Sequence, residues 1–295
     1  METSAGDGGG GLLPIVVGVD GSRPSDRAVE WAADRAVRMG RVLRLVYVSE
    51  VWPYEIPFHA APDDSESITW TDNQVLAEGE RVALAWRPDV ELECRLAVGG
   101  TVRVLSEGSQ HASELVVGHR GLGGFAGLLL GSVSVGVVAY AQSPVVVVRG
   151  ETGGRRGELA VGASLEGDAS ALAYAFEEAV SRGLRVRVVH AVPLPKGTDE
   201  EHLASDLERS EERARSRIAE ECADLRHRYP EADVIEDIVQ DRPAAALVAA
   251  SREADLVVAG VERAQPEARL PRRHAVRHAL VHHAECPVAL VRPRG

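Results

Sequence analysis

Short apolar runs alternate with longer amphipathic segments along the whole chain. The run at residues 15–19 is followed by a segment that begins near Pro24, in which Ala28, Val29, Ala32 and further apolar residues recur at helical spacing. The same alternation continues to the end of the sequence. We predict strands at residues 15–19, 42–48, 90–98, 115–118, 145–148, 159–162, 184–192, 234–239, 255–259 and 288–291. We predict the later helices at residues 73–86, 101–110, 132–141, 169–182, 201–228, 244–252 and 273–283.

Strands that alternate with helices in this way are typical of the α/β class, with a doubly wound parallel sheet and helices on both faces. In such sheets ligands bind beyond the carboxyl ends of the strands. The loops that follow the strands are therefore the first places to search for chemistry.

The sequence also repeats itself. Residues 113–118 (SELVVG) correspond to residues 255–260 (DLVVAG), and residues 143–149 (SPVVVVR) correspond to residues 286–292 (CPVALVR). The repeat predicts two tandem copies of one domain. We place a flexible tail at residues 1–11, a first domain at 12–150, a polar glycine-rich linker at 151–157 and a second domain at 158–295.

Composition narrows the possible partners and the compartment. The net charge of −12 disfavours binding to nucleic acid or to anionic membranes. The acidic, glycine-rich start lacks the pattern of a secretion signal, and no apolar run approaches the roughly 20 residues of a membrane-spanning helix. We therefore expect a cytoplasmic protein. Cys94, Cys222 and Cys286 lie far apart, so we expect reduced thiols, with Cys94 packed in the core.

The segment from Gly118 to Ser132 carries the most chemical information. It is glycine-rich and lies between a predicted strand and a predicted helix. Glycines allow the backbone to approach an anion closely, and a helix start offers unpaired N–H groups and a positive dipole end. Ser132 and Ser134 could donate hydroxyl hydrogen bonds to phosphate, and Arg120 could add positive charge. The alternative is that Ser132 is only a helix cap and that the glycines only form a tight loop.

The loop lacks the Gly-Lys-Ser/Thr sequence of a Walker motif, so fast phosphoryl transfer is not indicated. Asp20 follows the first strand at the same edge of the sheet and could accept hydrogen bonds from a ribose or a base. Its alternative role is in the turn formed by residues 20–22.

Taken together, Gly118-x2-Gly121-x9-Gly131-Ser132, Asp20 after the first strand and Pro144 before the last resemble the universal stress protein family in its tandem form. The resemblance implies two five-stranded sheets of order 3-2-1-4-5, ATP (possibly with Mg) at the loop, and pairing of domains through the last strand. It implies that the nucleotide residues are Asp20, Val48, Gly118, Gly121, Gly131, Ser132, Val133 and Ser134, to which we add Arg120. His119 departs from the small residue that is common in the family at its position.

The second copy departs from this pattern. Ser164 replaces Asp20, Arg263 replaces Gly121, and residues 273–275 (RHA) replace the helix start, while Glu262 and Glu267 add negative charge. We expect this domain not to bind ATP in the family manner.

Three histidines, His274, His278 and His282, recur every four residues in the last predicted helix. This spacing can hold a metal, but no carboxylate or cysteine completes a set nearby, so we favour a solvated or interface face.

The function that follows is a nucleotide-binding regulator of stress or dormancy, with one ATP site in the first domain. Two alternatives stay open: slow ATP hydrolysis assisted by Arg120 or His119, and an interaction protein that binds no nucleotide or a cyclic one. The apolar strands at Val145 and Val288 could pair within one chain, or a homodimer could form.

Overall fold

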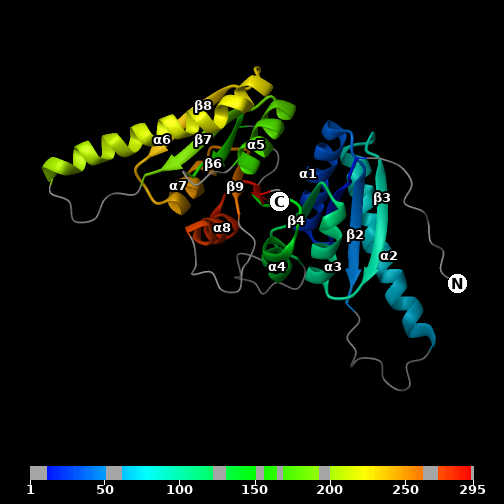
Figure 1. The fold of residues 1–295 in the computed structure, drawn as a ribbon. Coiled ribbons are helices and arrows are strands. Elements are labelled where there is room, and N and C mark those ends of the chain that lie inside the picture. The colour runs from blue at the N-terminus through cyan, green and yellow to red at the C-terminus, as the bar shows by residue number, and fades with distance from the viewer. Residues whose placement is uncertain are drawn as a thin grey trace.

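The computed structural model describes residues 12–50, 62–121, 131–150, 156–164, 169–192, 200–261 and 272–293, and its strands form one ten-stranded sheet (Figure 1). The strand order is β3-β2-β1-β4-β5-β10-β9-β6-β7-β8. The first half contains β1 Ile15–Val19, β2 Leu43–Ser49, β3 Leu92–Val98, β4 Glu114–Gly118 and β5 Val145–Val148. The second half contains β6 Glu158–Gly162, β7 Arg185–Ala191, β8 Val234–Val239, β9 Leu256–Gly260 and β10 Val288–Val291. Each half therefore has the expected 3-2-1-4-5 order.

The two halves meet where β5 pairs with β10. This pairing is antiparallel, with Val288 opposite Val147 and Leu290 opposite Val145, whereas the described strands within each half pair in parallel. The predicted pairing of the Val145 and Val288 strands inside one chain is confirmed. The result is a single continuous sheet rather than two separate ones.

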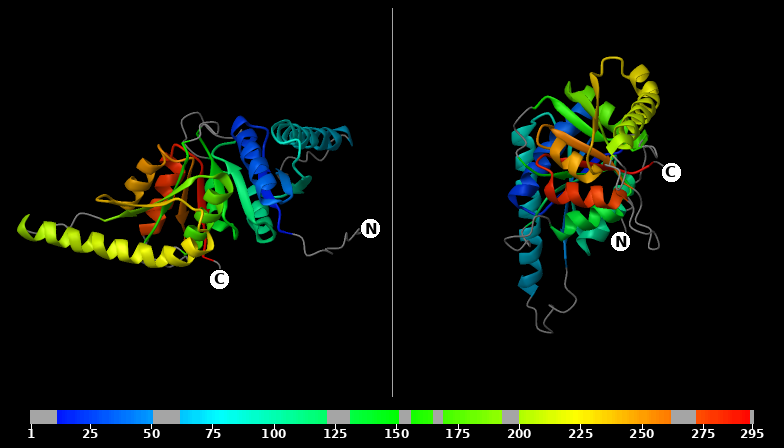
Figure 2. Two further views of the ribbon diagram at one scale, coloured as in Figure 1. Left: turned by 90° about the horizontal axis from the view of Figure 1, so that it is seen from above. Right: turned by 90° about the vertical axis from the view of Figure 1, so that its left-hand side faces the viewer.

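Helices cover both faces of this sheet (Figure 2). One face carries α1 Arg23–Met39, α2 Pro62–Trp86, α5 Ala169–Arg182 and α6 Glu200–Arg228. The other carries α3 Thr101–Gly108, the 3-10 turn η1 Ser109–His111, α4 Ser132–Tyr140, α7 Pro243–Ala250 and α8 Arg272–His283. Each face has one hydrophobic core that runs through both halves of the chain. Burial of apolar surface therefore stabilises the contact between the domains as well as each domain.

Local sequence signals set the ends of α1. The Ser22 hydroxyl accepts a hydrogen bond from the backbone N–H of Ser25 at 3.3 Å, and Pro24 stands in the first turn. The helix ends at Gly40, whose φ of 57° is left-handed, and the Gly40 N–H bonds back to carbonyls of the last turn.

Two expectations need correction. The helix expected at residues 73–86 begins at Pro62, in a polar stretch that has no apolar periodicity to reveal it. Cys94 is exposed rather than packed in the core, because β3 is an edge strand with β2 as its neighbour in the sheet. Leu96 and Val98, two and four residues further along β3, are also exposed.

Several other predictions fall outside the described residues, or partly so. The tail at residues 1–11 lies outside them, and so do residues 151–155 of the linker. In the part of the chain that the structure describes, no helix has the length and apolar content needed to cross a membrane.

Candidate functional site

A cleft of about 730 Å³ opens at the carboxyl ends of the strands in the first half. Its volume lies within the roughly 300–1,000 Å³ of typical small-molecule sites. The structure brings every predicted binding residue to the wall of this one cleft. These residues are Asp20, Val48, Gly118, Arg120, Gly121, Gly131, Ser132, Val133 and Ser134.

Two glycines of the loop allow close backbone approaches. A Cβ atom at Gly118 would lie 2.6 Å from the carbonyl oxygen of Pro24, so the end of β4 can meet the start of α1 only without a side chain. A Cβ atom at Gly121 would lie 2.1 Å from the Oδ2 atom of Asp20. Gly121 therefore lets the loop reach the Asp20 carboxylate. At Gly131 the nearest atom of the described residues would lie 3.5 Å from an added Cβ, so packing against these residues does not require glycine there.

The first turn of α4 forms the anion-binding end of the cleft. Gly131 precedes this helix without a side-chain cap, so the backbone N–H groups of Ser132, Val133 and Ser134 have no partner within the helix. The Gly131 N–H bonds to the carbonyl oxygen of His119 at 2.9 Å, which fixes the helix start against the loop. Unpaired N–H groups and the positive end of the helix dipole favour a bound anion at this position.

The two serines of this turn differ in their surroundings. The Ser132 side chain is exposed. Ser134 is buried, and its hydroxyl donates to the carbonyl oxygen of Gly118 at 2.7 Å. Because a serine hydroxyl has one hydrogen to donate, Ser134 in this conformation ties α4 to β4 rather than donating to phosphate.

Asp20 combines the two roles that the sequence suggested. Its Oδ1 accepts the backbone N–H of Ser22 at 3.0 Å, and its own N–H donates to the Ser25 hydroxyl at 3.2 Å, so it organises the turn before α1. Asp20 also lines the cleft. The turn holds the carboxylate at the cleft wall.

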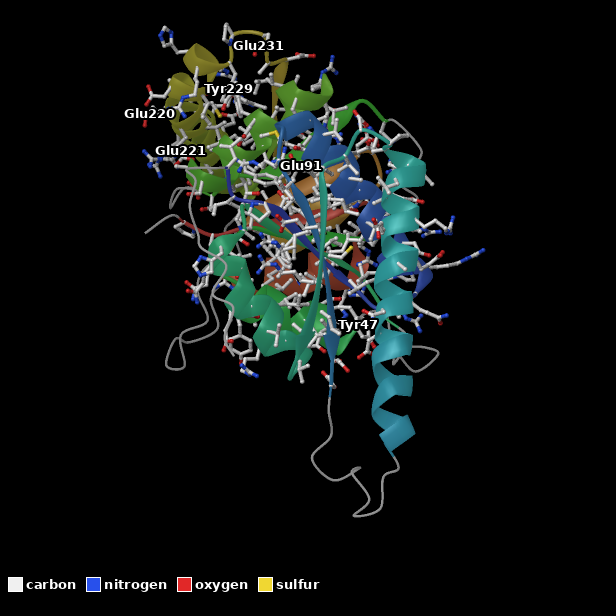
Figure 3. The ribbon with its side chains drawn as sticks, turned by 90° about the vertical axis from the view of Figure 1, so that its right-hand side faces the viewer. Tyr47, Glu91, Glu220, Glu221, Tyr229 and Glu231 are labelled. Carbon is white, nitrogen blue, oxygen red and sulfur yellow. The ribbon has the colours of Figure 1, made fainter. Side chains whose placement is uncertain are left out.

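Sequence reasoning missed several polar residues that line the cleft, among them Tyr47, Glu50 and Thr101. Glu50 accepts hydrogen bonds from the backbone N–H of Thr101 at 3.1 Å and from its hydroxyl at 2.7 Å, which joins the end of β2 to the start of α3. Tyr47 lies on β2 (Figure 3), where burial and then the nearby Asp72 carboxylate raise the pKa of its phenol. The signal was available, because Tyr47, Glu50 and Thr101 lie at the carboxyl ends of strands.

His119 does not take part in the cleft wall. Its backbone N–H donates to the carbonyl oxygen of Val148 at 3.0 Å, and its Nδ1 lies 3.3 Å from the same oxygen. Burial lowers the pKa of the imidazole, so the neutral ring, with Nδ1–H as donor, fits this contact. Of the two residues considered for assisting hydrolysis, Arg120 lines the cleft and His119 turns towards β5.

The second half can be compared only in part. Ser164 follows β6 as Asp20 follows β1. Arg263, Glu262 and Glu267 lie outside the described residues, as do the side chains of Arg273 and His274. The absence of ATP binding by this domain stays a prediction.

The histidine stripe on α8 is described at two of its positions. The rings of His278 and His282 stack with centroids 4.3 Å apart. Among the described side chains there is no group of three or more His, Cys, Asp or Glu residues placed to hold a metal ion.

Comparison with known proteins gives the same family for both halves. The sequence model of the universal stress protein family matches residues 12–149 and again residues 159–292. A universal stress protein of Mycolicibacterium smegmatis is 31% identical over 262 residues, covering 83% of this chain and 86% of the relative. A universal stress protein of Mycobacterium tuberculosis is 30% identical over 304 residues, covering 95% of each chain.

The fold is also shared with a crystal structure of a universal stress protein from Archaeoglobus fulgidus. That structure has a TM-score of 0.66 and 18% sequence identity, and the match covers 95% of this chain and 98% of the other. Both sequence matches extend across the two domains. The chain therefore belongs to the universal stress protein family and carries two copies of the family's domain in tandem.

Proposed function

We propose that this protein binds ATP in the cleft of its first domain and acts as a nucleotide-dependent regulator of stress or dormancy. The observation that carries the proposal is the convergence of the predicted residues from four separate segments on one cleft. Those segments are the residue after β1, the end of β2, the end of β4 with the loop after it, and the start of α4. The wall of the cleft offers an anion-binding helix start together with apolar and carboxylate groups.

Different parts of the cleft suit different parts of a nucleotide. The N–H groups at the start of α4, which have no partner within the helix, suit the phosphates, as do the Ser132 hydroxyl and the Arg120 guanidinium. Val48, buried at the end of β2, suits contact with the base, and the Asp20 carboxylate suits the hydroxyl groups of the ribose. A magnesium ion bound with the phosphates would offset part of their negative charge.

ATP in this account sets conformation or assembly and is not turned over. The two carboxylates on the cleft wall, Asp20 and Glu50, already accept hydrogen bonds from backbone N–H groups. The hydrogen bonds from Thr101 lower the pKa of the Glu50 carboxyl and weaken Glu50 as a general base. Slow hydrolysis and preference for a cyclic nucleotide are the two outcomes against which the proposal is measured.

The test is a calorimetric titration of the full chain with ATP, with Asp20→Ala as the variant and Ser164→Ala as its matched control in the second domain. We expect saturable binding, weakened roughly tenfold in Asp20→Ala, as for loss of a charged hydrogen-bond partner, and unchanged in Ser164→Ala. Absence of ATP binding, or displacement of ATP by a lower concentration of cyclic AMP, would overturn the proposal. Prolonged incubation with ATP and magnesium should leave the nucleotide intact, and release of ADP would favour the slow ATPase.

A further inference from the structure

Each domain sends one arginine into the other, immediately after its last strand. Arg149, which follows β5, donates through Nη1 to the carbonyl oxygens of Leu280 at 3.3 Å and Val281 at 2.6 Å, and through Nη2 to that of His282 at 3.1 Å. All three carbonyls belong to the end of α8 in the second domain.

Arg292, which follows β10, makes the reciprocal contact with α4 in the first domain. Its Nη2 donates to the carbonyl oxygens of Val138 and Ala139, both at 2.8 Å. The side chain is only 8% exposed. The antiparallel pairing of β5 with β10 explains the exchange, because it runs each strand's end past the last helix of the other domain.

Both contacts supply hydrogen-bond donors to carbonyl groups at the C-terminal end of a helix. The last four carbonyl groups of an α-helix lack partners within the helix, and the C-terminus carries a partial negative charge. A guanidinium placed there satisfies the carbonyls and interacts favourably with the helix dipole. For a short helix such as α4, with 9 residues, such a contact favours the helical state substantially.

The helix that Arg292 caps is also the helix that forms the anion-binding end of the cleft. At its start, α4 is tied to β4 by the bond from Ser134 to the Gly118 carbonyl, and along its length Gly136 packs closely on Val102 of α3. Nine residues span only about 14 Å. The C-terminal cap of α4 therefore acts on the same rigid element whose N–H groups face the cleft.

We propose that Arg292 makes the second domain a positive regulator of the nucleotide site in the first domain. This inference rests on the proposed function and deepens it. By holding the end of α4, Arg292 preorganises the N–H groups of residues 132–134 for the phosphates, and bound phosphates in turn strengthen the hold of Arg292 on α4. Linkage requires this reciprocity between nucleotide affinity and domain contact. The second domain thus has a role that does not depend on its own loop binding a nucleotide.

Arg149 supplies a matched control inside the same chain. It makes the same kind of contact between the two domains, but it caps α8 of the second domain. A general loosening of the domain contact would follow from loss of either arginine. A change in the nucleotide site that passes through α4 follows only from loss of Arg292.

The experiment compares Arg292→Ala, Arg149→Ala and the unaltered full chain. Hydrogen–deuterium exchange without nucleotide should show faster exchange across residues 131–141 in Arg292→Ala and across residues 272–284 in Arg149→Ala. Titration with ATP should show affinity roughly fivefold weaker in Arg292→Ala, the lower end of typical coupling between sites, and unchanged within about twofold in Arg149→Ala. If either alanine variant fails to fold, Arg292→Lys and Arg149→Lys replace the alanine variants. ATP affinity should then fall in Arg292→Lys, by less than about fivefold, and stay unchanged in Arg149→Lys.

Two results would overturn the inference: equal weakening of ATP binding in the two arginine variants, or unaltered affinity in Arg292→Ala. These differ from failure of the proposed function itself, in which the unaltered chain would bind no ATP.

Discussion

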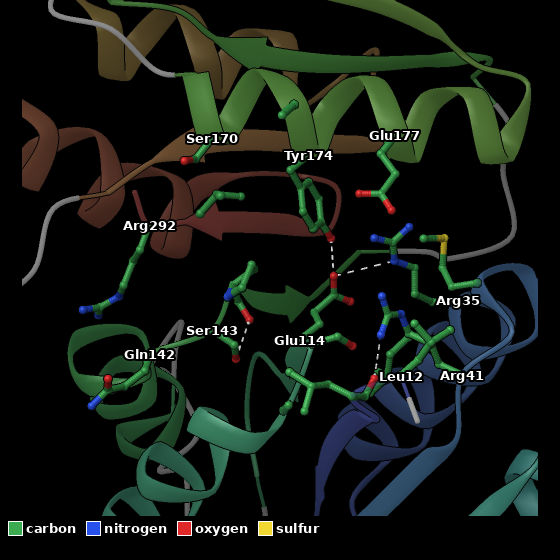
Figure 4. A pocket seen from close by; sticks show the side chains of 18 of the residues that line it. Leu12, Arg35, Arg41, Glu114, Gln142, Ser143, Ser170, Tyr174, Glu177 and Arg292 are labelled. Carbon is green, nitrogen blue, oxygen red and sulfur yellow. Dashed lines mark hydrogen bonds and ion pairs between the residues drawn. The ribbon is translucent and has the colours of Figure 1, made fainter. Parts of the chain in front are cut away.

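Tyr174 of the second domain donates its phenolic hydrogen to Glu114 of the first domain, with 2.5 Å between Oη and Oε2 (Figure 4). Both side chains are buried, and they border a pocket of about 920 Å³ between the domains. Arg35 of α1 approaches the same carboxylate, with 3.6 Å between its Nε and Oε2, and pairs with Glu178 of α5. Its guanidinium carbon lies 5.2 Å from the centre of the Tyr174 ring. A buried polar cluster thus accompanies the β5–β10 pairing in joining the domains.

Replacing Tyr174 with phenylalanine should destabilise the protein. The change removes the donor to Glu114 and leaves a buried carboxylate with one fewer hydrogen bond, which costs about 1–3 kcal/mol. Urea unfolding measures the loss. Tyr140→Phe is the control, because Tyr140 is 66% exposed, and it should change the free energy of unfolding by less than about 0.5 kcal/mol. Equal effects of the two changes would contradict the importance of the cluster.

The stability of the chain should depend on pH through Glu114. Burial, the largest influence, raises the pKa of Glu114 above its ordinary value of 4.5 despite the nearby Arg35. Between 4.5 and this raised pKa the folded state holds more protons than the unfolded state, so stability falls as pH rises through that window. Glu114→Gln removes the carboxyl group and with it this dependence of stability on pH. The variant should therefore gain stability relative to the unaltered chain as pH is raised from about 4.5, measured by urea unfolding at several pH values. A difference that stays constant with pH would speak against a raised pKa.

The glycines of the loop should respond differently to alanine. Gly118→Ala places a Cβ atom 2.6 Å from the backbone of Pro24, which cannot easily move, so we expect a loss of about 2–3 kcal/mol. In Gly131→Ala the added Cβ atom comes no closer than 3.5 Å to any atom of the described residues, so the change should cost less than about 1 kcal/mol. Thermal and urea unfolding of the two variants check the ranking, and the reverse ranking would contradict the geometry of the loop.

The three cysteines should differ in reactivity. Cys94 is exposed, whereas Cys222 and Cys286 are buried, and burial raises the pKa of their thiols to about 11 and about 12. Iodoacetamide should therefore label the folded chain at Cys94, with the other two thiols labelled only after unfolding. Mass analysis of peptides from the labelled protein identifies the modified cysteines. Labelling of Cys286 in the folded chain would contradict its burial.

Much of the fold could be predicted because apolar periodicity reports burial directly. The start of α1 near Pro24 and the pairing of the Val145 and Val288 strands both followed from local pattern and repeat. Alternation of residues along the strand suggested a buried Cys94, because alternation does not tell whether a strand lies at the edge of the sheet. The edge position of β3 was implied only by the expected strand order 3-2-1-4-5. The early start of α2 at Pro62 lies in polar sequence that has no such periodicity.

The cleft was more predictable than the contact between the domains. Its predicted residues lie at the carboxyl ends of strands, directly after them, or at the start of a helix, and the rule for ligand positions in α/β sheets applies to them. The cluster of Arg35, Glu114 and Tyr174 joins positions far apart in the sequence, and nothing in their local surroundings marks them as partners. The contacts of Arg149 and Arg292 with α8 and α4 depend on the antiparallel seam and appear only once both domains are placed.

The number of ATP molecules bound per chain tests the central claim most directly. Native mass spectrometry of the full chain with excess ATP counts them, and Gly131→Arg places a bulky side chain at the start of α4, where the phosphates are expected. We predict one ATP per unaltered chain and none in Gly131→Arg. Two ATP molecules per chain, none at all, or one retained in the variant would contradict a single nucleotide site in the first domain.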